Sequence, residues 1–383
     1  MPESSEAKTR PAWAEVDLDA ITANTRAVVD AVAPAAVCAV VKANGYGHGA
    51  ADAARAALRG GAVRLGVALA EEGVALRKEG IEAPVLLLSQ PSAAAMADVV
   101  RYDLTPTLYS ARAVGALASA AKRRDVVVPV HVKVDTGMHR VGAEPDVAVA
   151  LAAQIADTAG LELEGFYTHL AVSEDMSRSA ITDAALDRFD AAVAKLAAQG
   201  VTPNILHAAN SGGALGHPRS RYAMVRVGIA LYGYAPGPDL DDSLPLTPAM
   251  QLKARVTHVQ HLSAGEGISY GLRFVTDRPT VIATLPLGYA DGVPRALSFS
   301  PGAAVLIGGR RCPLAGTITM DQLMVDCGPD STVEPGDEVV LVGTQGDETI
   351  TAEEWADRLG TISYEVLCGI GPRVPRRVHG AHD

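Results

Sequence analysis

The stretch VCAVVKANGYGHGAADAARAALRG, residues 37–60, shows the unit from which most of the chain is built. It begins with an apolar, β-branched run that ends at Lys42 and continues through a segment rich in glycine. Its final part, residues 49–60, is rich in alanine and has the period of an amphipathic helix. A buried strand, a turn and a helix in this order are typical of parallel sheets, where helices connect neighbouring strands.

The same pattern recurs along the first two thirds of the chain. Strand candidates are found at residues 37–42, 64–69, 84–89, 104–109, 129–135, 163–169, 203–209 and 224–231. Helical segments such as 49–60, 69–80, 110–124 and 184–200 lie among them. Eight such units predict an α/β fold, a (β/α)8 barrel of the TIM type, with a doubly wound open sheet as the alternative.

The sequence pattern changes after the linker YGYAPGPDLDDSLPLTP, residues 232–248, which is rich in proline, glycine and aspartate. Apolar β-runs at 251–262, 279–288 and 337–343 have no long helix among them, which favours a mostly antiparallel β domain. We therefore predict a barrel over residues 12–245 and a β-rich domain over 246–383. The N-terminal segment 1–11 can pack on the second domain.

Composition excludes several classes of function. The 33 Lys and Arg residues against 44 Asp and Glu give a net charge of -11, without the basic cluster that binds a phosphate backbone, so nucleic acid is not an expected partner. We expect no membrane span, and the polar first ten residues predict a cytoplasmic protein. Cys38, Cys312, Cys327 and Cys368 lack metal-ligand spacing, so reduced structural thiols and no metal site are expected.

Polar residues gather where the predicted barrel strands end. They are Lys42, Lys133, Asp135, His169, Asn210, Ser211 and Arg226. Active sites of such barrels form at the carboxyl ends of the strands, so we expect these side chains to converge. Taken singly, each has an ordinary explanation: Lys42 as a solvated charge, His169 as a core histidine, Arg226 as half of a structural ion pair.

The glycine-rich turn after Lys42 favours chemistry over chance. Glycines let the backbone approach a ligand closely, and the helix that follows presents its N-terminus to an anion. A lysine amine beside a site for a phosphate-sized anion suggests a Schiff base to pyridoxal phosphate.

Nine motifs follow one another along the chain: AVVKANGYGHGA, KVDTGMHRVG, THLA, HAANS, MVRVGIALYGY, AGEGISYG, LGYADGVPR, MDQLMVD and SYEVLCGIGPRVPR. Together they resemble the alanine racemase family of barrel-fold pyridoxal-phosphate enzymes. The resemblance covers the chain from about residue 12 to 377. The resemblance implies an isomerase that interconverts L-alanine and D-alanine, supplying D-alanine for peptidoglycan.

The resemblance also implies a two-base mechanism on a pyridoxal-phosphate aldimine. Lys42 would hold the cofactor and act as one base, and Tyr270 would be the second base, reaching in from a partner subunit of a homodimer. Racemisation needs two opposed groups, because a planar carbanion loses its proton on one face and regains it on the other. His169 and Arg226 are the expected source of the field that favours the Tyr270 phenolate.

Further cofactor contacts are implied by the same resemblance. Arg226 would face the pyridine nitrogen, where arginine can donate a hydrogen bond but does not readily give up a proton. The other predicted cofactor-binding residues are Tyr46, His169, Asn210, Ser211, Gly228, Ile229 and Tyr364, of which all but His169 and Asn210 would bind the phosphate.

The substrate carboxylate would lie near Arg140 and the backbone N–H of Met320. Lys133 would be carbamylated, so that it becomes an anion and orients Arg140. The alternative is an unmodified Lys133 paired with Asp135 or with a bound anion.

An entry corridor is expected around Tyr289 and Arg295, and Tyr270 with Tyr289 would restrict the pocket to a methyl-sized side chain. Two positions depart from the family pattern. The family commonly has Asp at the position of Glu174 and Arg at the position of Thr317. Those two residues pair in the family, so we expect an altered KM or altered minor substrates here, with the same reaction.

Three other functions compete with this interpretation. A broad-specificity racemase of the same fold is usually exported and disulfide-bearing, unlike this chain. A decarboxylase of basic amino acids would gain from a stronger electron sink than Arg226 allows. A cofactor-carrying homeostasis protein built on the barrel alone would not need the β-rich domain.

Overall fold

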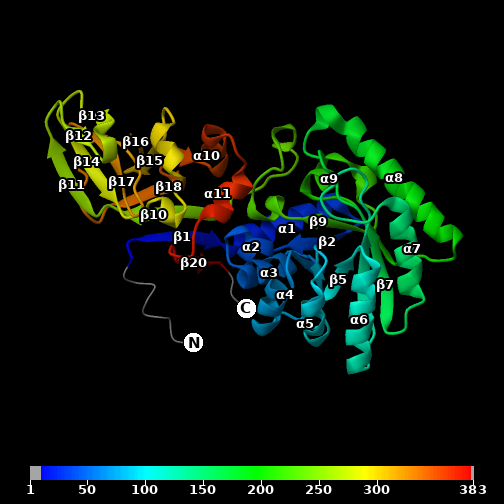
Figure 1. The fold of residues 1–383 in the computed structure, drawn as a ribbon. Coiled ribbons are helices and arrows are strands. Elements are labelled where there is room, and N and C mark those ends of the chain that lie inside the picture. The colour runs from blue at the N-terminus through cyan, green and yellow to red at the C-terminus, as the bar shows by residue number, and fades with distance from the viewer. Residues whose placement is uncertain (1–9, 381–383) are drawn as a thin grey trace. The chain divides into compact units, whose positions relative to one another are not determined.

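The computed structural model describes residues 10–380, which form two compact units (Figure 1). One unit is Asp19–Thr247. The other consists of Pro248–Asp383 together with the beginning of the chain as far as Leu18. The second unit is therefore built from both ends of the sequence.

The first unit is a barrel of eight parallel strands in the order β8-β7-β6-β5-β4-β3-β2-β9. Hydrogen bonds from Ala223 N to Leu206 O (3.0 Å) and from Arg226 N to Ala209 O (2.9 Å) join β8 to β9 and close the ring. The predicted (β/α)8 barrel is confirmed, and the open sheet is excluded. The strands are β2 (Ala36–Val40), β3 (Arg64–Val67), β4 (Val85–Leu87), β5 (Thr105–Leu108), β6 (Val128–Lys133), β7 (Leu161–Tyr167), β8 (Ile205–His207) and β9 (Met224–Val227).

Helices connect these strands and cover the outside of the ring (Figure 1). They are α1 (Leu18–Val32), α3 (Ala50–Arg59), α4 (Ala70–Lys78), α5 (Met96–Arg101), α6 (Ala111–Arg124), α7 (Pro145–Ala156), α8 (Ser179–Ala198) and α9 (Ser211–Gly216), with a short turn α2 (Lys42–Tyr46) after β2. Small alanine side chains form much of the buried face, as in α3, where Ala53, Ala54, Ala56 and Ala57 are buried. The helices can therefore approach the strands closely.

One irregularity in the barrel lies between β6 and β7. Val130 pairs with Leu163, but the next residue, His131, pairs with Gly165, so that Glu164 is an extra residue in β7. Such a bulge turns a side chain away from the face that regular alternation would give it. Glu164 thereby contacts His131 and Arg64.

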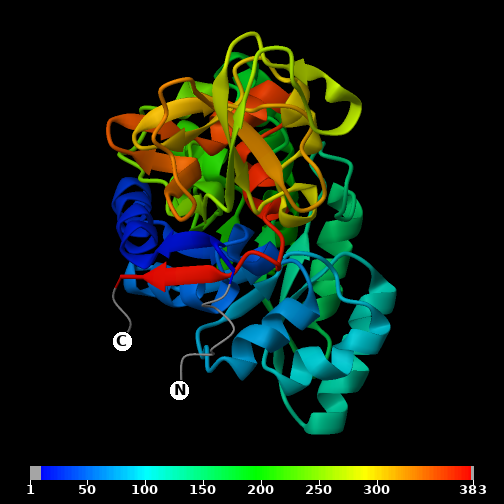
Figure 2. The ribbon, with the colours of Figure 1, turned by 90° about the vertical axis from the view of Figure 1, so that its left-hand side faces the viewer.

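The second unit contains three sheets. The largest runs β16-β15-β18-β10-β1-β20 with β19 beside β18, and the smaller ones are β11-β14-β17 and β12-β13. All these pairs are antiparallel except β1 with β20, which run parallel and side by side (Figure 2). The elements are β1 (Ala12–Asp17), β10 (Met250–Arg255), β11 (His258–Leu262), β12 (Gly267–Ile268), β13 (Phe274–Val275), β14 (Thr280–Leu285), β15 (Ala304–Ile307), β16 (Arg310–Pro313), β17 (Leu323–Gly328), β18 (Glu338–Gln345), β19 (Glu348–Ile350), β20 (Arg376–His379), α10 (Ala352–Leu359) and α11 (Ser363–Gly369).

The boundary predicted at residue 12 differs from the observed one. β1 pairs with β10 and β20, so residues 12–17 belong to the β-rich unit, and the barrel begins after Leu18. The sequence AWAEVD is recognisable as a strand, but its pattern does not show which sheet it joins. Pro11 also lies in the β-rich unit, where its carbonyl accepts a hydrogen bond from Arg255 N, whereas residues 1–9 lie outside the described residues.

The four cysteines are free thiols, of which Cys38, Cys312 and Cys327 are buried and Cys368 is exposed. Over residues 10–380, no group of His, Cys, Asp and Glu side chains has the arrangement of a metal site. No helix in the same range combines the length and the apolar character needed to cross a membrane.

The contact between α1 and the end of α3 provides a test of barrel packing. A Cβ added at Gly60 would lie 2.5 Å from Thr25 Cβ and 2.7 Å from Thr22 O. We expect Gly60→Ala to lower the free energy of unfolding of the barrel by about 1–3 kcal/mol, because α1 must move to accept the methyl group. Gly115 of α6 is the matched control, since a Cβ there meets no atom within 4 Å. Gly115→Ala should stabilise by up to about 1 kcal/mol through helix propensity. Urea midpoints measured on both variants decide the matter, and equal shifts would contradict the packing argument.

Candidate active site

Four cationic side chains gather at the carboxyl ends of the barrel strands. Lys42 follows β2, Lys133 ends β6, Arg140 lies in the loop after β6, and Arg226 lies in β9. Burial lowers the pKa of Lys133 to about 7, and the positive charges of Arg226, Arg140 and Lys42 contribute to the decrease. The sequence predicts that polar side chains at these strand ends converge, and the charges of Arg226, Arg140 and Lys42 lie near enough to act on Lys133.

Asp135 is the carboxylate next to this cluster, but it serves the loop that carries Arg140. Its Oδ1 accepts hydrogen bonds from the backbone N–H groups of Gly137, Met138 and His139 at 2.9–3.1 Å. Burial alone would raise the pKa of Asp135, but these hydrogen bonds and the charge of His139 lower it overall. Within residues 10–380, the Asp135 carboxylate lies 3.3 Å from His139 Nδ1 and forms no ion pair with Lys133, but its charge opposes the cations in setting the Lys133 pKa.

Arg226 is only 4% exposed, and its guanidinium group is held by neutral acceptors. Nη1 donates to His207 Nδ1 at 2.8 Å, and Nη2 lies 2.9 Å from Thr168 O, 3.0 Å from Ala208 O and 3.1 Å from His169 Nδ1. No carboxylate among the described residues forms an ion pair with it. The ion pair that would have been its ordinary structural explanation is therefore not what holds Arg226.

Both histidines beside Arg226 are neutral. Burial lowers the pKa of His207 and of His169 well below the ordinary value, and the charge of Arg226 is the next cause in each case. Because arginine has no acceptor, the Nδ1 atom of each histidine accepts a hydrogen from it. The positive field at this place therefore comes from the arginine.

The turn that follows Lys42 has an unusual backbone. Residues 43–47 all have positive φ angles, from 51° at Ala43 to 85° at Gly47, so the chain makes a left-handed turn. Each non-glycine residue in this conformation costs about 1–2 kcal/mol. Glu72 at the start of α4 accepts hydrogen bonds from the backbone N–H of Ala43 and Ala68, at 2.7 Å each, and so anchors the turn. This anchoring fixes the backbone conformation of the turn that follows Lys42.

Three hydrogen-bonding groups meet beside this turn. The Tyr46 hydroxyl lies so close to Gly228 that a Cβ at Gly228 would be 2.4 Å from it, and Gly228 N donates to Ser211 Oγ at 3.1 Å. The ring of Tyr46 stacks on Tyr232, with 4.9 Å between centroids. Ile229, the next residue, begins a short 3-10 helix. Only glycine fits at position 228, and the result is a small polar cradle lined by Tyr46, Ser211 and Gly228.

Asn210 has a supporting position. Its Oδ1 accepts from Gly213 N (2.9 Å), which caps α9, and from Ser173 Oγ (2.6 Å). Its amide nitrogen reaches Leu170 O at 3.5 Å. These contacts hold the loop that carries Ser211 in place.

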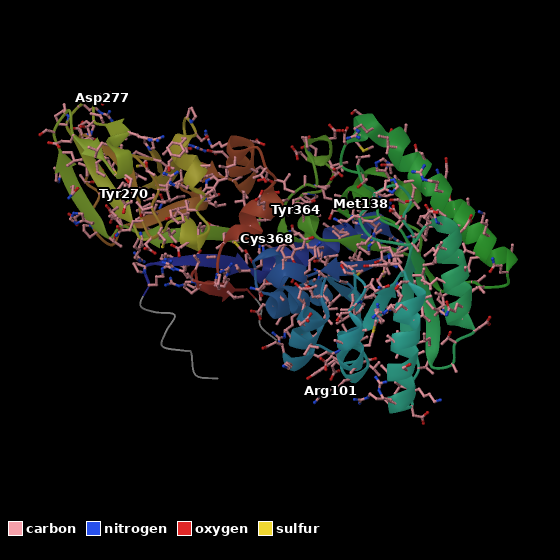
Figure 3. All side chains as sticks on the ribbon, in the orientation of Figure 1. Arg101, Met138, Tyr270, Asp277, Tyr364 and Cys368 are labelled. Carbon is pink, nitrogen blue, oxygen red and sulfur yellow. The ribbon has the colours of Figure 1, made fainter. Side chains whose placement is uncertain are left out.

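The β-rich unit contains the other predicted residues, and Figure 3 labels Tyr270 and Tyr364. The Tyr270 side chain is exposed, at 75%. Two hydrogen bonds hold its backbone in place. Thr317 Oγ1 donates to Tyr270 O at 3.0 Å, and Ser269 Oγ donates to Thr317 O at 2.6 Å. Thr317, the departure from the family pattern, thus holds the turn of the predicted second base.

The predicted corridor and substrate residues of this unit lie in two adjoining loops. Tyr289 N donates to Thr319 O at 3.0 Å, and a Cβ at Gly288 would lie 2.4 Å from Met320 O, so the loops pack backbone to backbone. Arg295 lies over the ring of Phe299 at 5.4 Å. Tyr364 is the second residue of α11. Glu174, the other departure, belongs to the barrel unit.

Sequence reasoning missed several polar residues in the barrel interior. His207 stacks on Tyr167 at 4.4 Å with 9° between the rings, and the Arg226 guanidinium lies 4.8 Å over Tyr167. His131 and Glu164 continue this group away from Arg226. These residues could have been found from the sequence, because each is a histidine or glutamate within a strand that is predicted to be buried, as in PVHVKVD, LEGFYTH and PNILHAA.

Comparisons with known proteins agree over nearly the whole chain. Residues 16–236 match the family described as alanine racemase, N-terminal domain, and residues 249–378 match alanine racemase, C-terminal domain. The alanine racemase of Symbiobacterium thermophilum is 49% identical over 367 residues, which are 96% of this chain and 97% of that protein.

Solved structures give the same result. Alanine racemase from Streptomyces lavendulae, which produces D-cycloserine, has a TM-score of 0.92 at 36% identity, with 98% of each chain covered. A histidine racemase from Leuconostoc mesenteroides has a TM-score of 0.88 at 26% identity, covering 98% of this chain and 99% of that one. The chain belongs to the alanine racemase family and so to the pyridoxal-phosphate-dependent isomerases.

Proposed function

We propose that this protein interconverts L-alanine and D-alanine with pyridoxal phosphate as its cofactor. One observation carries the proposal: the positive charges of Arg226, Arg140 and Lys42 act together on the amine of Lys133, with Asp135 as the carboxylate that opposes them. A centre of this kind favours anionic ligands, and the phosphate of the cofactor and the carboxylate of an amino acid are two of them.

The residues of the barrel fit this cofactor. A reactive amine at Lys42, a polar cradle at Tyr46, Ser211 and Gly228, and a buried donor at Arg226 match its aldehyde, its phosphate and its ring nitrogen. A phosphate needs no lysine or arginine where several neutral donors converge on it. Ile229 and Tyr364 remain predicted phosphate ligands, while Asn210 supports the cradle through Ser211.

When bound, pyridoxal phosphate supplies a conjugated ring that accepts electrons from the amino acid's Cα. Lys42 would anchor the cofactor through its amine and would hold or release a proton at one face of Cα. Tyr270 does the same at the opposite face. Arg226 donates a hydrogen bond to the ring nitrogen and keeps its own proton, which favours fast return of a proton to Cα over side reactions.

The exposure of Tyr270 supports a composite site in a homodimer. Its side chain is 75% exposed, and the β-rich unit also exposes Leu272, Val275, Phe299 and Ile362 at 47–62%. Exposed apolar groups of this size are typical of surfaces that a partner subunit covers. A second copy of the chain would then bring Tyr270 to a neighbouring barrel, with two equivalent sites per dimer.

Substrate binding is assigned to Arg140 and the Met320 backbone, with Lys133 orienting Arg140. A pKa of about 7 leaves much of Lys133 as a neutral amine at neutral pH, which is the form that reacts with carbon dioxide. The carbamate would place a negative charge among Lys42, Arg140 and Arg226.

The corridor decides between alanine and larger substrates. Thr317 is 2% exposed and hydrogen-bonds to the Tyr270 backbone, so it cannot form the salt bridge that Arg forms at this position in the family. A broad-specificity racemase is the second candidate, because one solved relative is a histidine racemase. Arg226 argues against a decarboxylase. A cytoplasmic location and a role in peptidoglycan supply complete the proposal.

The proposed activity can be tested directly. Purified protein with pyridoxal phosphate should show the visible absorbance of the bound cofactor and convert L-alanine in deuterium oxide into both enantiomers, with deuterium at Cα. Lys42→Ala should lose the covalent absorbance and the conversion. Serine, lysine and arginine should react more slowly than alanine, and a faster reaction with any of them would favour the broad-specificity alternative. Lack of exchange with every amino acid would contradict a racemase.

Subunit mixing tests the origin of Tyr270. Lys42→Ala and Tyr270→Ala homodimers should each be inactive, but a fully reshuffled equal mixture should regain about a quarter of the wild-type activity. Half of the dimers are then mixed, and each of these has one intact site of two. If exchange is proven by native mass spectrometry and no activity returns, Tyr270 acts within its own chain.

Carbamylation of Lys133 should depend on pH with a definite sign. With its pKa lowered to about 7, the amine becomes mostly protonated below that pH and cannot add carbon dioxide. We expect a carbon-13 carbamate signal above about pH 7 that fades about one pH unit below this value. Lys133→Arg should remove the signal, whereas Lys195→Arg, at an exposed ion pair, should leave it. A signal that persists in Lys133→Arg would assign the carbamate elsewhere.

A further inference from the structure

A buried chain of hydrogen bonds leads from Arg226 through the barrel interior to Glu164. Arg226 Nη1 lies 2.8 Å from His207 Nδ1, and His207 Nε2 lies 2.8 Å from His131 Nδ1. His131 Nε2 lies 2.8 Å from Glu164 Oε2. Arg64 closes the far end with two bonds to the Glu164 carboxylate, at 2.6 and 2.9 Å. Four strands and the bulge in β7 contribute to this chain, and the proposed reaction uses none of it beyond Arg226.

Every proton in the chain has one possible position. Arginine can only donate, so His207 accepts at Nδ1 and carries its hydrogen on Nε2. His207 Nε2 then donates to His131 Nδ1, and His131 carries its own hydrogen on Nε2 and donates it to the carboxylate. The direction of donation is therefore set by the two ends of the chain, a guanidinium and a carboxylate, and both imidazoles must be neutral.

The fold makes specific room for this arrangement. A Cβ at Gly165 would lie 2.3 Å from His131 Nδ1, so glycine is required beside the ring, and the bulge turns Glu164 towards His131. Both histidines have 0% exposure. The charged groups that face the two rings are Arg226, Lys133, Arg64 and Glu164, with the Tyr167 phenol stacked on His207. Arg226 and Arg64 are always positive, which disfavours another cation on either imidazole.

We propose that Glu164 is a positioning residue of the active site, which acts through His131 and His207 to keep an acceptor nitrogen in front of Arg226. The carboxylate fixes the hydrogen of His131, His131 fixes that of His207, and His207 holds the Arg226 guanidinium in its orientation. Only the link from Arg226 to the cofactor ring rests on the proposed function. The direction of the chain is a property of the barrel itself.

Loss of the acceptor at position 164 should reverse the chain. Glu164 Oε2 accepts from both His131 Nε2 and Arg64 Nη1, while Oε1 accepts from Arg64 Nη2, so an amide could keep its oxygen on His131 but the side chain of Glu164→Leu cannot. Without that acceptor, His131 carries its hydrogen on Nδ1 and donates it to His207 Nε2. His207 reverses in turn, and its Nδ1 hydrogen opposes the hydrogen of Arg226 Nη1. The conflict reaches the active site without any change in the residues that line it.

Nitrogen-15 NMR of the histidine rings reads the tautomers directly, in the full-length protein with and without pyridoxal phosphate. We expect both His131 and His207 with hydrogen on Nε2, and signals unchanged between about pH 6 and pH 9. Glu164→Leu should move the hydrogen to Nδ1 on at least one ring. In the loaded enzyme, kcat should fall about tenfold with KM within about twofold, as for outer hydrogen-bond partners of ligating histidines.

Two further variants separate positioning from stability. Glu164→Gln keeps an oxygen in the Oε2 position as an acceptor for His131, so it should retain the original tautomers and most of the wild-type kcat. Thr105→Val removes a neighbour of Arg64 at 3.5 Å outside the chain and should change neither readout. An Nδ1 hydrogen on either ring in the wild type, or unchanged tautomers in Glu164→Leu, would overturn the proposal. These outcomes are independent of racemisation, and should Glu164→Leu fail to fold, the wild-type and Glu164→Gln spectra still decide.

Discussion

The burial of one guanidinium group without a carboxylate partner constrains much of the barrel. An isolated charge in a protein interior is costly unless hydrogen bonds replace its water. For Arg226 these bonds come from two backbone carbonyls and two imidazole nitrogens on neighbouring strands. Acceptors of this kind satisfy the donors of the guanidinium but leave its positive charge uncompensated. That charge then acts on whatever lies at the mouth of the barrel, including the amine of Lys133.

The same constraint explains why polar residues occupy positions that a barrel normally fills with aliphatic side chains. His207 must be neutral to accept from Arg226, and Tyr167 covers one face of its ring. His131 extends the hydrogen bonding, and Gly165 leaves space for its ring. Each of these polar side chains forms a hydrogen bond with the next, so replacing one by an aliphatic residue would leave a buried partner without its hydrogen bond.

The architecture was predictable from the sequence because it depends on repeated patterns. Eight apolar strands alternating with alanine-rich helices specify a closed parallel barrel, and Lys42, Lys133 and Arg226 could be assigned to one rim from their places at strand ends. The left-handed turn at residues 43–47 was not predictable, since alanine and tyrosine rarely adopt positive φ and both Ala43 and Tyr46 do so here. The bulge at Glu164 was not predictable either, because a one-residue slip in pairing leaves no mark on the hydrophobic pattern. The supporting role of Thr317 likewise depends on a backbone contact distant in sequence.

The pairing of β1 with β10 and β20 has a consequence for how the chain is made. β1 precedes both of its partners in the chain, since its antiparallel neighbour begins at Met250 and its parallel neighbour at Arg376. The barrel strands are complete once β9 has left the ribosome, so they can close while β1 still lacks both partners. An apolar strand without its partners is exposed to pairing with other nascent chains. The shortness of β1 limits that hazard, and the sheet around β1 can be completed only after β20 has left the ribosome.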